Sequence, residues 1–204
     1  GSGELGIVSS DSSTSGALGN IHFGNSTDSS LASIRATADG ATDAGKLEFN
    51  TEATGGAIET ALRIDSGGRV FKPRQVSFIA NGTNAAYINT SPIPFPNVVQ
   101  NVGNGYNNSN YTFTAPVAGT YLIHCHIGLT QGASGASVYP YLAINGSNHF
   151  YTYHAINASA VASNCNMTQL LVLAANDTVK LNFYGTGNYY NNSAECRFMG
   201  CLLH

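Results

Sequence analysis

Charge is the scarcest property of this chain. Only 9% of its 204 residues are Asp, Glu, Lys or Arg, against an average of about 25% in soluble domains. Asn, Ser, Thr and Gly fill the polar positions instead, and the formal net charge is −3. A chain without a basic field has no electrostatic means of holding nucleic acid or anionic lipid, so we expect neither as a partner.

Long hydrophobic runs are also missing. No apolar stretch approaches the roughly 20 residues that a membrane-spanning helix needs, so we expect no membrane insertion by a helix. The chain opens with Gly1-Ser2 rather than Met, and we expect it to be the C-terminal part of a longer protein.

Carboxylates are nearly absent after residue 73, where the only acids are Asp177 and Glu195. A glycosidase needs two positioned carboxylates, and Asp177 follows Asn176 in a predicted hairpin turn, where its ordinary role is turn formation. A Ser-His-acid arrangement lacks an acid beside any histidine. The sequence therefore predicts a protein that is not an enzyme.

Four cysteines, at positions 125, 165, 196 and 201, show neither CxxC nor metal-finger spacing. We expect free buried thiols, as in a protein assembled in a reducing cytoplasm. Cys196 and Cys201 have an odd separation and would lie on opposite faces of a shared strand. In a secreted chain, four cysteines would still allow three pairings.

The distribution of charge divides the chain in two. Residues 1–73 hold nine acids and five bases, whereas residues 74–204 hold two acids and three bases. Together with Pro73, this shift predicts a first domain over 1–73 and a second over 74–204, with a boundary near residues 71–75.

The first domain is expected to consist of short β-strands. Residues 21–24, 33–36, 46–50 and 61–65 alternate apolar and polar residues between turns rich in Gly and Asp. Such strands cannot hold a core alone. Three copies wound around a common axis could, because each unit of a fibre is stabilised by its neighbours. The alternative is a disordered linker, which low hydrophobicity would also fit.

The second domain shows turn signals between short apolar strands and no helical period, which predicts an all-β antiparallel sandwich. The strongest hairpin signal is Asn145-Gly146. The predicted strands are residues 75–80, 87–88, 98–102, 112–114, 121–129, 138–144, 149–155, 167–173, 179–184 and 197–204.

The strand over residues 121–129 has two usable faces. Tyr121, Ile123, Cys125 and Ile127 share one face, and Leu122, His124 and His126 share the other. A strand with apolar or weakly polar residues on both faces is covered on both, by its own core and by something else. In a chain of this size, another copy of the same chain often provides the second cover.

Four stretches resemble the globular head of the C1q-like family, part of the larger C1q and tumour-necrosis-factor group. They are residues 94–106 (PFPNVVQNVGNGY), 111–127 (YTFTAPVAGTYLIHCHI), 171–181 (LVLAANDTVKL) and 198–203 (FMGCLL), in the family's order. The resemblance covers residues 74–204. It implies a ten-stranded antiparallel jelly-roll sandwich that assembles as a tight homotrimer, but no particular ligand, because this scaffold hosts many partners.

The first domain resembles a different group of proteins, the tail fibres of bacteriophages and other virion appendages. The similar units are residues 19–24 (GNIHFG), 45–49 (GKLEF) and 62–70 (LRIDSGGRV). Heads of the C1q type in animals usually follow collagen, and this sequence has no Gly-X-Y period. We therefore expect a short β-rich fibre shaft before the head.

In the C1q-like family, the sheet that carries the strand at 121–129 and the last strand forms the trimer interface. Carried over, the resemblance places Leu122, His124, His126, Phe198, Leu202 and His204 toward the three-fold axis. Their apolar content fits an obligate interface, which is less polar than a transient one.

The pair His124 and His126 is a candidate metal site. A three-fold axis would bring six imidazoles together, and imidazole suits transition metals such as iron, nickel, copper or zinc. The alternative is a pair of neutral histidines that are hydrogen-bonded or packed, and the family often carries His without metal at the position of His126. Calcium, known in some family members, would need clustered carboxylates that this head lacks.

Tyrosines beside amides are the candidates for ligand binding. Tyr with Asn and Ser is the composition of adaptable recognition surfaces, and it also suits sugars; the alternative is that the tyrosines pack inside the sandwich. The candidates in predicted loops are Tyr106, Asn188, Tyr189, Tyr190 and Asn191, and those around the 145–146 hairpin are His149, Tyr151 and Tyr153, clustered with Tyr139, Tyr141 and His154.

These observations predict the trimeric tip of a bacteriophage tail fibre that binds a glycan or an outer-membrane protein on the host cell. Such a protein would reside on the virion and act outside the cell, with many weak contacts multiplied into avidity. Two alternatives stay open: a structural cap that trimerises a fibre, and a secreted C1q-like adhesin or lectin.

Overall fold

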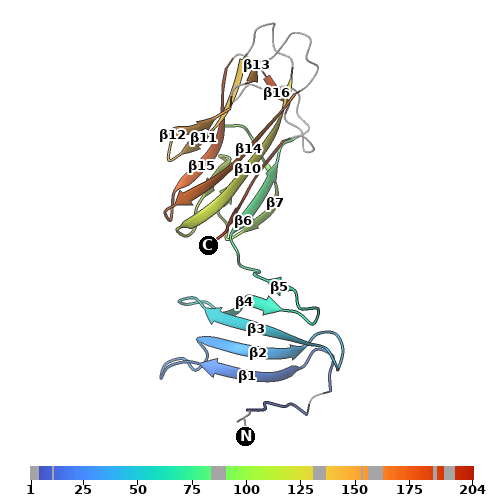
Figure 1. The fold of residues 1–204 in the computed structure, drawn as a ribbon. Coiled ribbons are helices and arrows are strands. Elements are labelled where there is room, and N and C mark those ends of the chain that lie inside the picture. Colours follow the sequence, from blue (N-terminus) through green and yellow to red (C-terminus); the bar gives the residue numbers. More distant parts are fainter. Residues whose placement is uncertain are drawn as a thin grey trace. The chain divides into compact units, whose positions relative to one another are not determined.

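The computed structural model describes residues 5–10, 12–83, 91–130, 137–152, 154–155, 163–185, 188–190 and 196–204. The chain forms two compact units, Gly1–Arg74 and Gln75–His204. All regular structure in the described residues is β-strand, and this part of the chain holds no helix able to span a membrane. Figure 1 shows the strands of each unit.

The first unit is one antiparallel sheet whose strands pair in chain order (Figure 1). Its strands are β1 (Ala17–Phe23), β2 (Ala32–Ala38), β3 (Gly45–Glu52), β4 (Ile58–Ile64) and β5 (Val70–Phe71). The turns between β2 and β5 contain Gly40, Gly55 and Gly68, all with positive φ, a conformation that glycine adopts without steric cost. Each of the four strands predicted for residues 1–73 overlaps one of these.

The two faces of this sheet differ in polarity. Directly paired residues share a face, and one row across β1–β4 is wholly apolar: Ile21, Ile34, Phe49 and Leu62. The neighbouring row on the other face alternates in charge: Arg35, Glu48 and Arg63, with Arg63 lying 4.5 Å over the ring of Phe71. Ile21 remains 40% exposed and Phe49 38% exposed, so this layer leaves apolar surface to be buried by another layer.

The second unit is a sandwich of two sheets (Figure 1). The histidine sheet has the order β14–β10–β17–β6–β7, formed by Ser163–Leu173, Gly119–Thr130, Arg197–Leu202, Ser77–Asn81 and Asn97–Val102, with β16 (Asn188–Tyr190) paired to β10. The tyrosine sheet has the order β12–β11–β15–β9–β8, formed by Ser147–Tyr151, Ser137–Ile144, Thr178–Gly185, Thr112–Thr114 and Tyr106–Asn107, with β13 (His154–Ala155) paired to β11.

An aromatic cluster joins the two sheets. Phe78 of β6 stacks on Phe113 of β9 at 4.6 Å and on Tyr106 of β8 at 5.1 Å between ring centroids. Phe198 of β17 meets Phe78 edge-on at 4.9 Å. These rings belong to one continuous core, and stacked and edge-on aromatic pairs stabilise it beyond their buried area.

Every strand predicted on described residues of the second unit overlaps an observed strand. The predicted strand 87–88 lies outside the described residues. The single strand predicted over 149–155 is two separate strands, β12 and β13, both paired to β11. Strands β8 and β16 form where loops were predicted. Strand β8 pairs with β9 across a turn, and β16 pairs with β10, which is distant from it along the sequence.

The core position of Phe198 leads to the first prediction. Phe198→Ala should lower the free energy of unfolding by about 3–5 kcal/mol, because it leaves a cavity among packed rings. All 11 tyrosines lie after residue 74 and the chain has no Trp. Urea unfolding followed by tyrosine fluorescence, at one protein concentration, therefore reports on the second unit.

The matched control is Val117→Ala, since Val117 is a 44% exposed residue in the turn before β10. This change should alter the free energy of unfolding by no more than about 0.5 kcal/mol. Equal effects of the two substitutions would contradict the core position of Phe198.

Candidate functional site

Strand β10 lies between β14 and β17 in the middle of the histidine sheet. Tyr121, Ile123, Cys125 and Ile127 are buried on its inner face, whereas its outward side chains, from Leu122 to His126, are partly exposed. The predicted division of this strand into two faces is confirmed. The outer face of β10 is therefore available for contact with another molecule.

The outer face of the histidine sheet changes from apolar to polar along β10. Residues paired across the strands lie on the same face. They form three rows: Leu170–Leu122–Cys201–Ser77, Thr168–His124–Met199–Ile79 and Asn166–His126–Arg197–Asn81. The first row is mostly apolar, and the third carries amides, an imidazole and a guanidinium.

The two histidines are held by β14 through the same ring nitrogen. Nδ1 of His124 lies 2.8 Å from Oγ1 of Thr168, and Nδ1 of His126 lies 2.5 Å from Oδ1 of Asn166. An amide oxygen only accepts, so Nδ1 of His126 carries a proton. In the neutral ring, the lone pair is then on Nε2, which is the arrangement of a histidine that binds a metal through Nε2.

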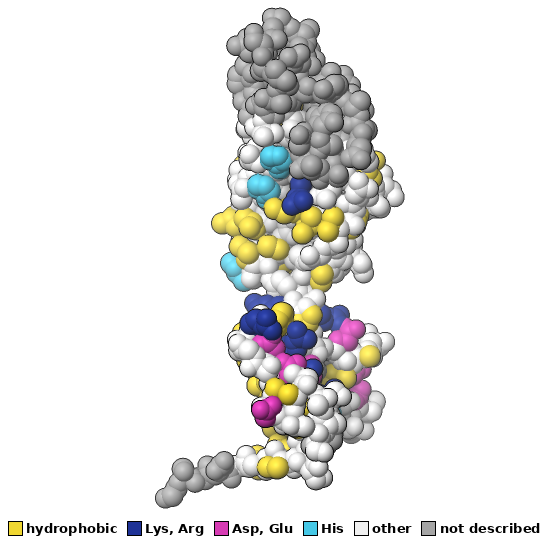
Figure 2. Space-filling view, turned by 90° about the vertical axis from the view of Figure 1, so that its right-hand side faces the viewer, with side chains coloured by type: hydrophobic (Ala, Val, Ile, Leu, Met, Phe, Trp, Pro, Cys, Tyr) yellow, Lys and Arg dark blue, Asp and Glu magenta, His cyan; other side chains and the backbone are white. Residues whose placement is uncertain are grey.

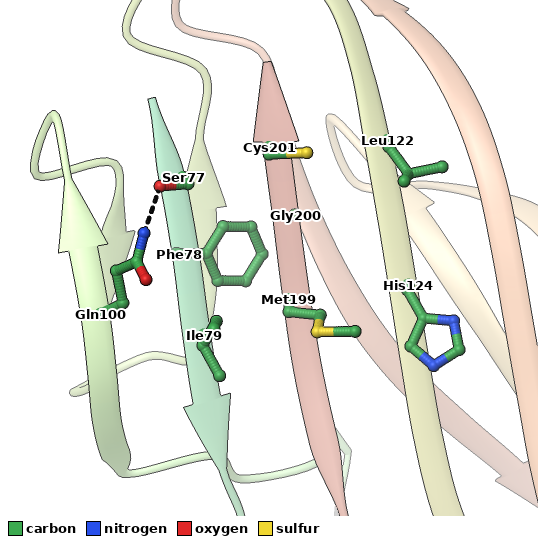
Figure 3. A pocket seen from close by; sticks show the side chains of 9 residues that line it. All are labelled: Ser77, Phe78, Ile79, Gln100, Leu122, His124, Met199, Gly200 and Cys201. Atoms are coloured by element: carbon green, nitrogen blue, oxygen red, sulfur yellow. Dashed lines mark hydrogen bonds between the residues drawn. The ribbon is translucent and has the colours of Figure 1, made fainter. Parts of the chain in front are cut away.

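A shallow hollow of about 200 Å³ lies beside His124 (Figure 3). Figure 3 shows Leu122 and His124 on β10 next to Met199 and Cys201 on β17, with Ser77 and Ile79 on β6 beyond them. Nε2 of Gln100 donates a hydrogen bond of 2.6 Å to the Ser77 hydroxyl at its edge. The hollow is apolar in character and carries one imidazole.

Two predicted interface residues, Phe198 and Leu202, are not on this outer face. Phe198 pairs with Cys125 and is 0% exposed, and Leu202 pairs with Tyr121 and packs against the core. Both point inward, because opposite residues of paired strands share a face. The prediction that Phe198 and Leu202 point toward the three-fold axis is therefore wrong, because these residues of the last strand face the core.

The residues of β17 that do face outward are Arg197, Met199 and Cys201. Sequence reasoning missed them because the segment Phe-Met-Gly-Cys-Leu has apolar or small residues at every position, so alternation cannot select a face. The signal in the sequence that could have identified the inward face is Gly200. A Cβ at this position would lie 2.6 Å from Cδ1 of Ile123 and 2.8 Å from Cε1 of Phe78. His204 is exposed, with Nε2 3.2 Å from Oγ1 of Thr120.

A second hollow, of about 630 Å³, lies on the tyrosine sheet. It is lined by Tyr139, Tyr141, Asn148, Tyr151 and Tyr184, which come from β11, β12 and β15. Of the predicted binding residues, Tyr151 lines this hollow, together with Tyr139 and Tyr141 from the cluster predicted around the hairpin. His149, on the same strand as Tyr151, is exposed but is not among the lining residues.

Tyr106 is not a surface binding residue. Its side chain is buried, its ring stacks on Phe78, and its hydroxyl donates a hydrogen bond of 3.0 Å to the carbonyl of Phe95. Burial raises the pKa of Tyr106 above the ordinary value. The sequence interpretation as an exposed loop was wrong because the pairing of β8 with β9 carries this residue into the core.

The remaining binding candidates are described only in part. Asn188, Tyr189 and Tyr190 form β16, which pairs with β10, rather than the predicted loop. Their side chains lie outside the described structure, as do Tyr153 and Asn191 entirely. Their role in binding stays a prediction.

The predicted metal site needs more than one chain. Among the described residues, no group of three His, Cys, Asp or Glu side chains could hold a metal ion. One chain supplies two imidazoles, so a site at His124 and His126 requires further copies around an axis, and it stays a prediction.

None of the four cysteines is in a disulfide bond. Cys125, Cys165 and Cys196 are buried, as predicted, whereas Cys201 is only partly buried on the outer face. Burial raises the pKa of Cys125 and raises that of Cys165 to about 11. These two thiols are therefore protonated and unreactive at neutral pH.

The environment of His124 generates the second prediction. Burial, then the neighbouring charges of His126 and Arg197, lower the pKa of His124 below its ordinary value of 6.5. The unfolded chain therefore binds this proton at higher pH than the folded chain. The contribution of His124 to the free energy of unfolding is therefore fully present above pH 6.5. It is lost as the pH falls from there toward the pKa of His124 in the folded state.

A ring-resolved NMR titration should give His124 a midpoint below 6.5. His124→Gln should remove part of the acid-side slope of stability against pH. A midpoint at or above 6.5 would contradict the partial burial of His124 beside His126 and Arg197.

Comparison with known proteins identifies the family of this two-sheet unit. The C1q domain family matches residues 77–203, and no curated protein matches the chain. The globular domain of the zebrafish complement 1qA protein is 15% identical, covering 63% of this chain and 98% of its own (TM-score 0.48). Murine APRIL is 10% identical, covering 63% and 99% (TM-score 0.51), and the Eiger TNF of S. frugiperda is 11% identical, covering 64% and 94% (TM-score 0.48).

The likeness to APRIL shows a shared fold and nothing of its ligand. The sequence match covers more than half of the chain, over the strands that build the two-sheet jelly roll. The chain therefore belongs to the C1q family.

Proposed function

We propose that this chain is the trimeric tip of a bacteriophage tail fibre and that its C1q unit binds a receptor on the surface of the host cell. C1q and TNF-like domains usually form trimers that bind ligands or receptors. The observation that carries the proposal is the outer face of the histidine sheet, which one copy of the chain leaves open to solvent.

That face has the composition of a subunit interface. Leu170 is 62% exposed and Val172 85% exposed on β14, next to the partly exposed Leu122 and Met199. Figure 2 shows histidines beside a band of hydrophobic side chains on the second unit. Contiguous apolar surface of this kind marks an interaction site, and in this fold the occupant we propose is two further copies of the chain.

The first unit independently supports an assembly of copies. Its single sheet presents the apolar row from Ile21 to Leu62, which its polar opposite face cannot cover. Three such sheets facing one another would bury this row and make a thin shaft. A shaft of short strands in place of a collagen repeat favours a virion fibre over a secreted adhesin, the second candidate function.

The trimer is tested by mass. Light scattering and ultracentrifugation should give three chains per particle, and Leu122→Asp should yield single chains, because a buried carboxylate without a partner opposes association. Lys180→Asp, on the outer face of the tyrosine sheet, is the control and should leave the mass unchanged. A wild-type particle of one chain would contradict the assembly.

The receptor role is tested by adsorption. Fluorescently labelled protein should bind cells of particular bacterial strains and should block infection by a phage that uses the fibre. The single-chain Leu122→Asp variant should bind at least about 100-fold more weakly, because it loses avidity.

Two outcomes would overturn the receptor role. Fibres that lack residues 75–204 but adsorb normally would show that the C1q unit is a structural cap. Binding to animal cells, with no bacterial strain bound, would favour the secreted adhesin.

A further inference from the structure

The hollow on the tyrosine sheet is built from four tyrosines that the core does not use. Tyr139 pairs with Tyr184, and Tyr141 pairs with Asn182 on one side and Tyr151 on the other. These residues alternate with the buried Val138, Leu142, Leu181 and Phe183. The alternation places the rings of Tyr139, Tyr141 and Tyr184 on the outer face, and the pairing of Tyr151 with Tyr141 places the fourth ring there too. Packing of the sandwich does not require these rings.

The rings form two tilted pairs. The centroids of Tyr141 and Tyr151 are 4.9 Å apart at an interplanar angle of 31°, and those of Tyr139 and Tyr184 are 5.8 Å apart at 49°. Tyr151 remains 55% exposed and Tyr184 69% exposed. Large aromatic faces left open in a concave site are surfaces on which an apolar face of a ligand can stack.

The polar groups of the hollow are hydroxyls and amides. Asn148 lines it. Asn182 is not among the lining residues, but its amide nitrogen donates a 3.5 Å hydrogen bond to the hydroxyl of Tyr141, which is one of them. The amide oxygen of Asn182 is buried and accepts no hydrogen bond from the described residues. Tyrosine hydroxyls and asparagine amides can each donate and accept, so the site can match a ligand that presents many hydroxyl groups.

Among the described residues that line this hollow, none is charged. Lys180 lies on the same outer face of β15, but it is paired with Ala143 and is not part of the lining. These described lining residues therefore offer no cation to an anionic ligand and no carboxylate to a cationic ligand. The volume of about 630 Å³ falls within the range of about 300–1,000 Å³ for small-ligand sites.

We propose that the hollow formed by Tyr139, Tyr141, Asn148, Tyr151 and Tyr184 binds a neutral carbohydrate. The apolar C–H face of a sugar ring stacks on the open tyrosine faces, and its hydroxyls exchange hydrogen bonds with Asn148 and the tyrosine hydroxyls. This inference rests on the proposed function, because it assigns the receptor to a class of chemistry, the neutral glycan of a cell surface. Three copies in a trimer would present three such sites.

The test uses the full chain and an array of neutral, sialylated and sulfated oligosaccharides. Calorimetry follows with the neutral sugars that bind. Tyr151→Ala and Tyr184→Ala should each weaken binding at least about tenfold, because each removes a stacking surface. Tyr141→Phe keeps the ring and should give a smaller loss. Lys180→Ala is the matched control on the same face and should leave binding unchanged.

Folding is checked by the mass of the particle and by its near-ultraviolet circular dichroism. Binding of charged oligosaccharides alone, with loss in Lys180→Ala, would overturn the proposal. Equal binding by Tyr151→Ala, Tyr184→Ala and the wild type would also overturn it.

Treatment of the cells separates this inference from the proposed function. Periodate, which destroys sugars, should abolish adsorption of the labelled protein, and protease should not. Adsorption that survives periodate and is lost after protease would show a protein receptor and overturn the carbohydrate site, while the receptor role stands. Neutral sugar binding without adsorption to any bacterial strain would leave this site in place and contradict the fibre function.

Discussion

The pairing of β10 with β14 and β17 is the constraint on which the rest of the C1q unit depends. Because side chains alternate along a strand, this register decides at once which residues enter the core and which face outward. Its inner residues, with Phe78 and Phe198, close the sandwich. The outer residues of β10, which are Leu122, His124 and His126, lie in rows with the outer residues of β14 and β17. The core and the proposed interface are thus two sides of one strand, and a change of register would destroy both.

The two units meet the same physical requirement with different numbers of layers. The first is a single sheet with one apolar face, and the second is a sandwich whose outer histidine face is partly apolar. In both, one copy leaves apolar surface in water, which association of copies would remove. An assembly built in this way holds its copies through hydrophobic burial, with few ion pairs, in keeping with the low charge of the chain.

Low charge also shapes what the free surfaces can recognise. The tyrosine sheet offers rings, hydroxyls and amides, and the described residues that line its hollow include no ionised group. Recognition on such a surface depends on stacking and on hydrogen bonds of defined direction, and salt screens it little compared with an ionic contact. In the proposed trimer, avidity would add to contacts that are individually weak, so a shallow site on each copy would be sufficient for attachment.

The sequence alone determined most of the strands and the two faces of β10, because these depend on local alternation and turn chemistry. It missed β8 and β16, which form through their pairing with β9 and β10. It did not determine the faces of β17, since Phe198 and Met199 are both apolar and only pairing with Cys125 and His124 separates them. Nor could it place Tyr106 in the core or bring Tyr184 beside Tyr139, which is 45 positions earlier in the chain. Those choices belong to the tertiary structure, because residues distant in sequence share a face only after their strands have paired.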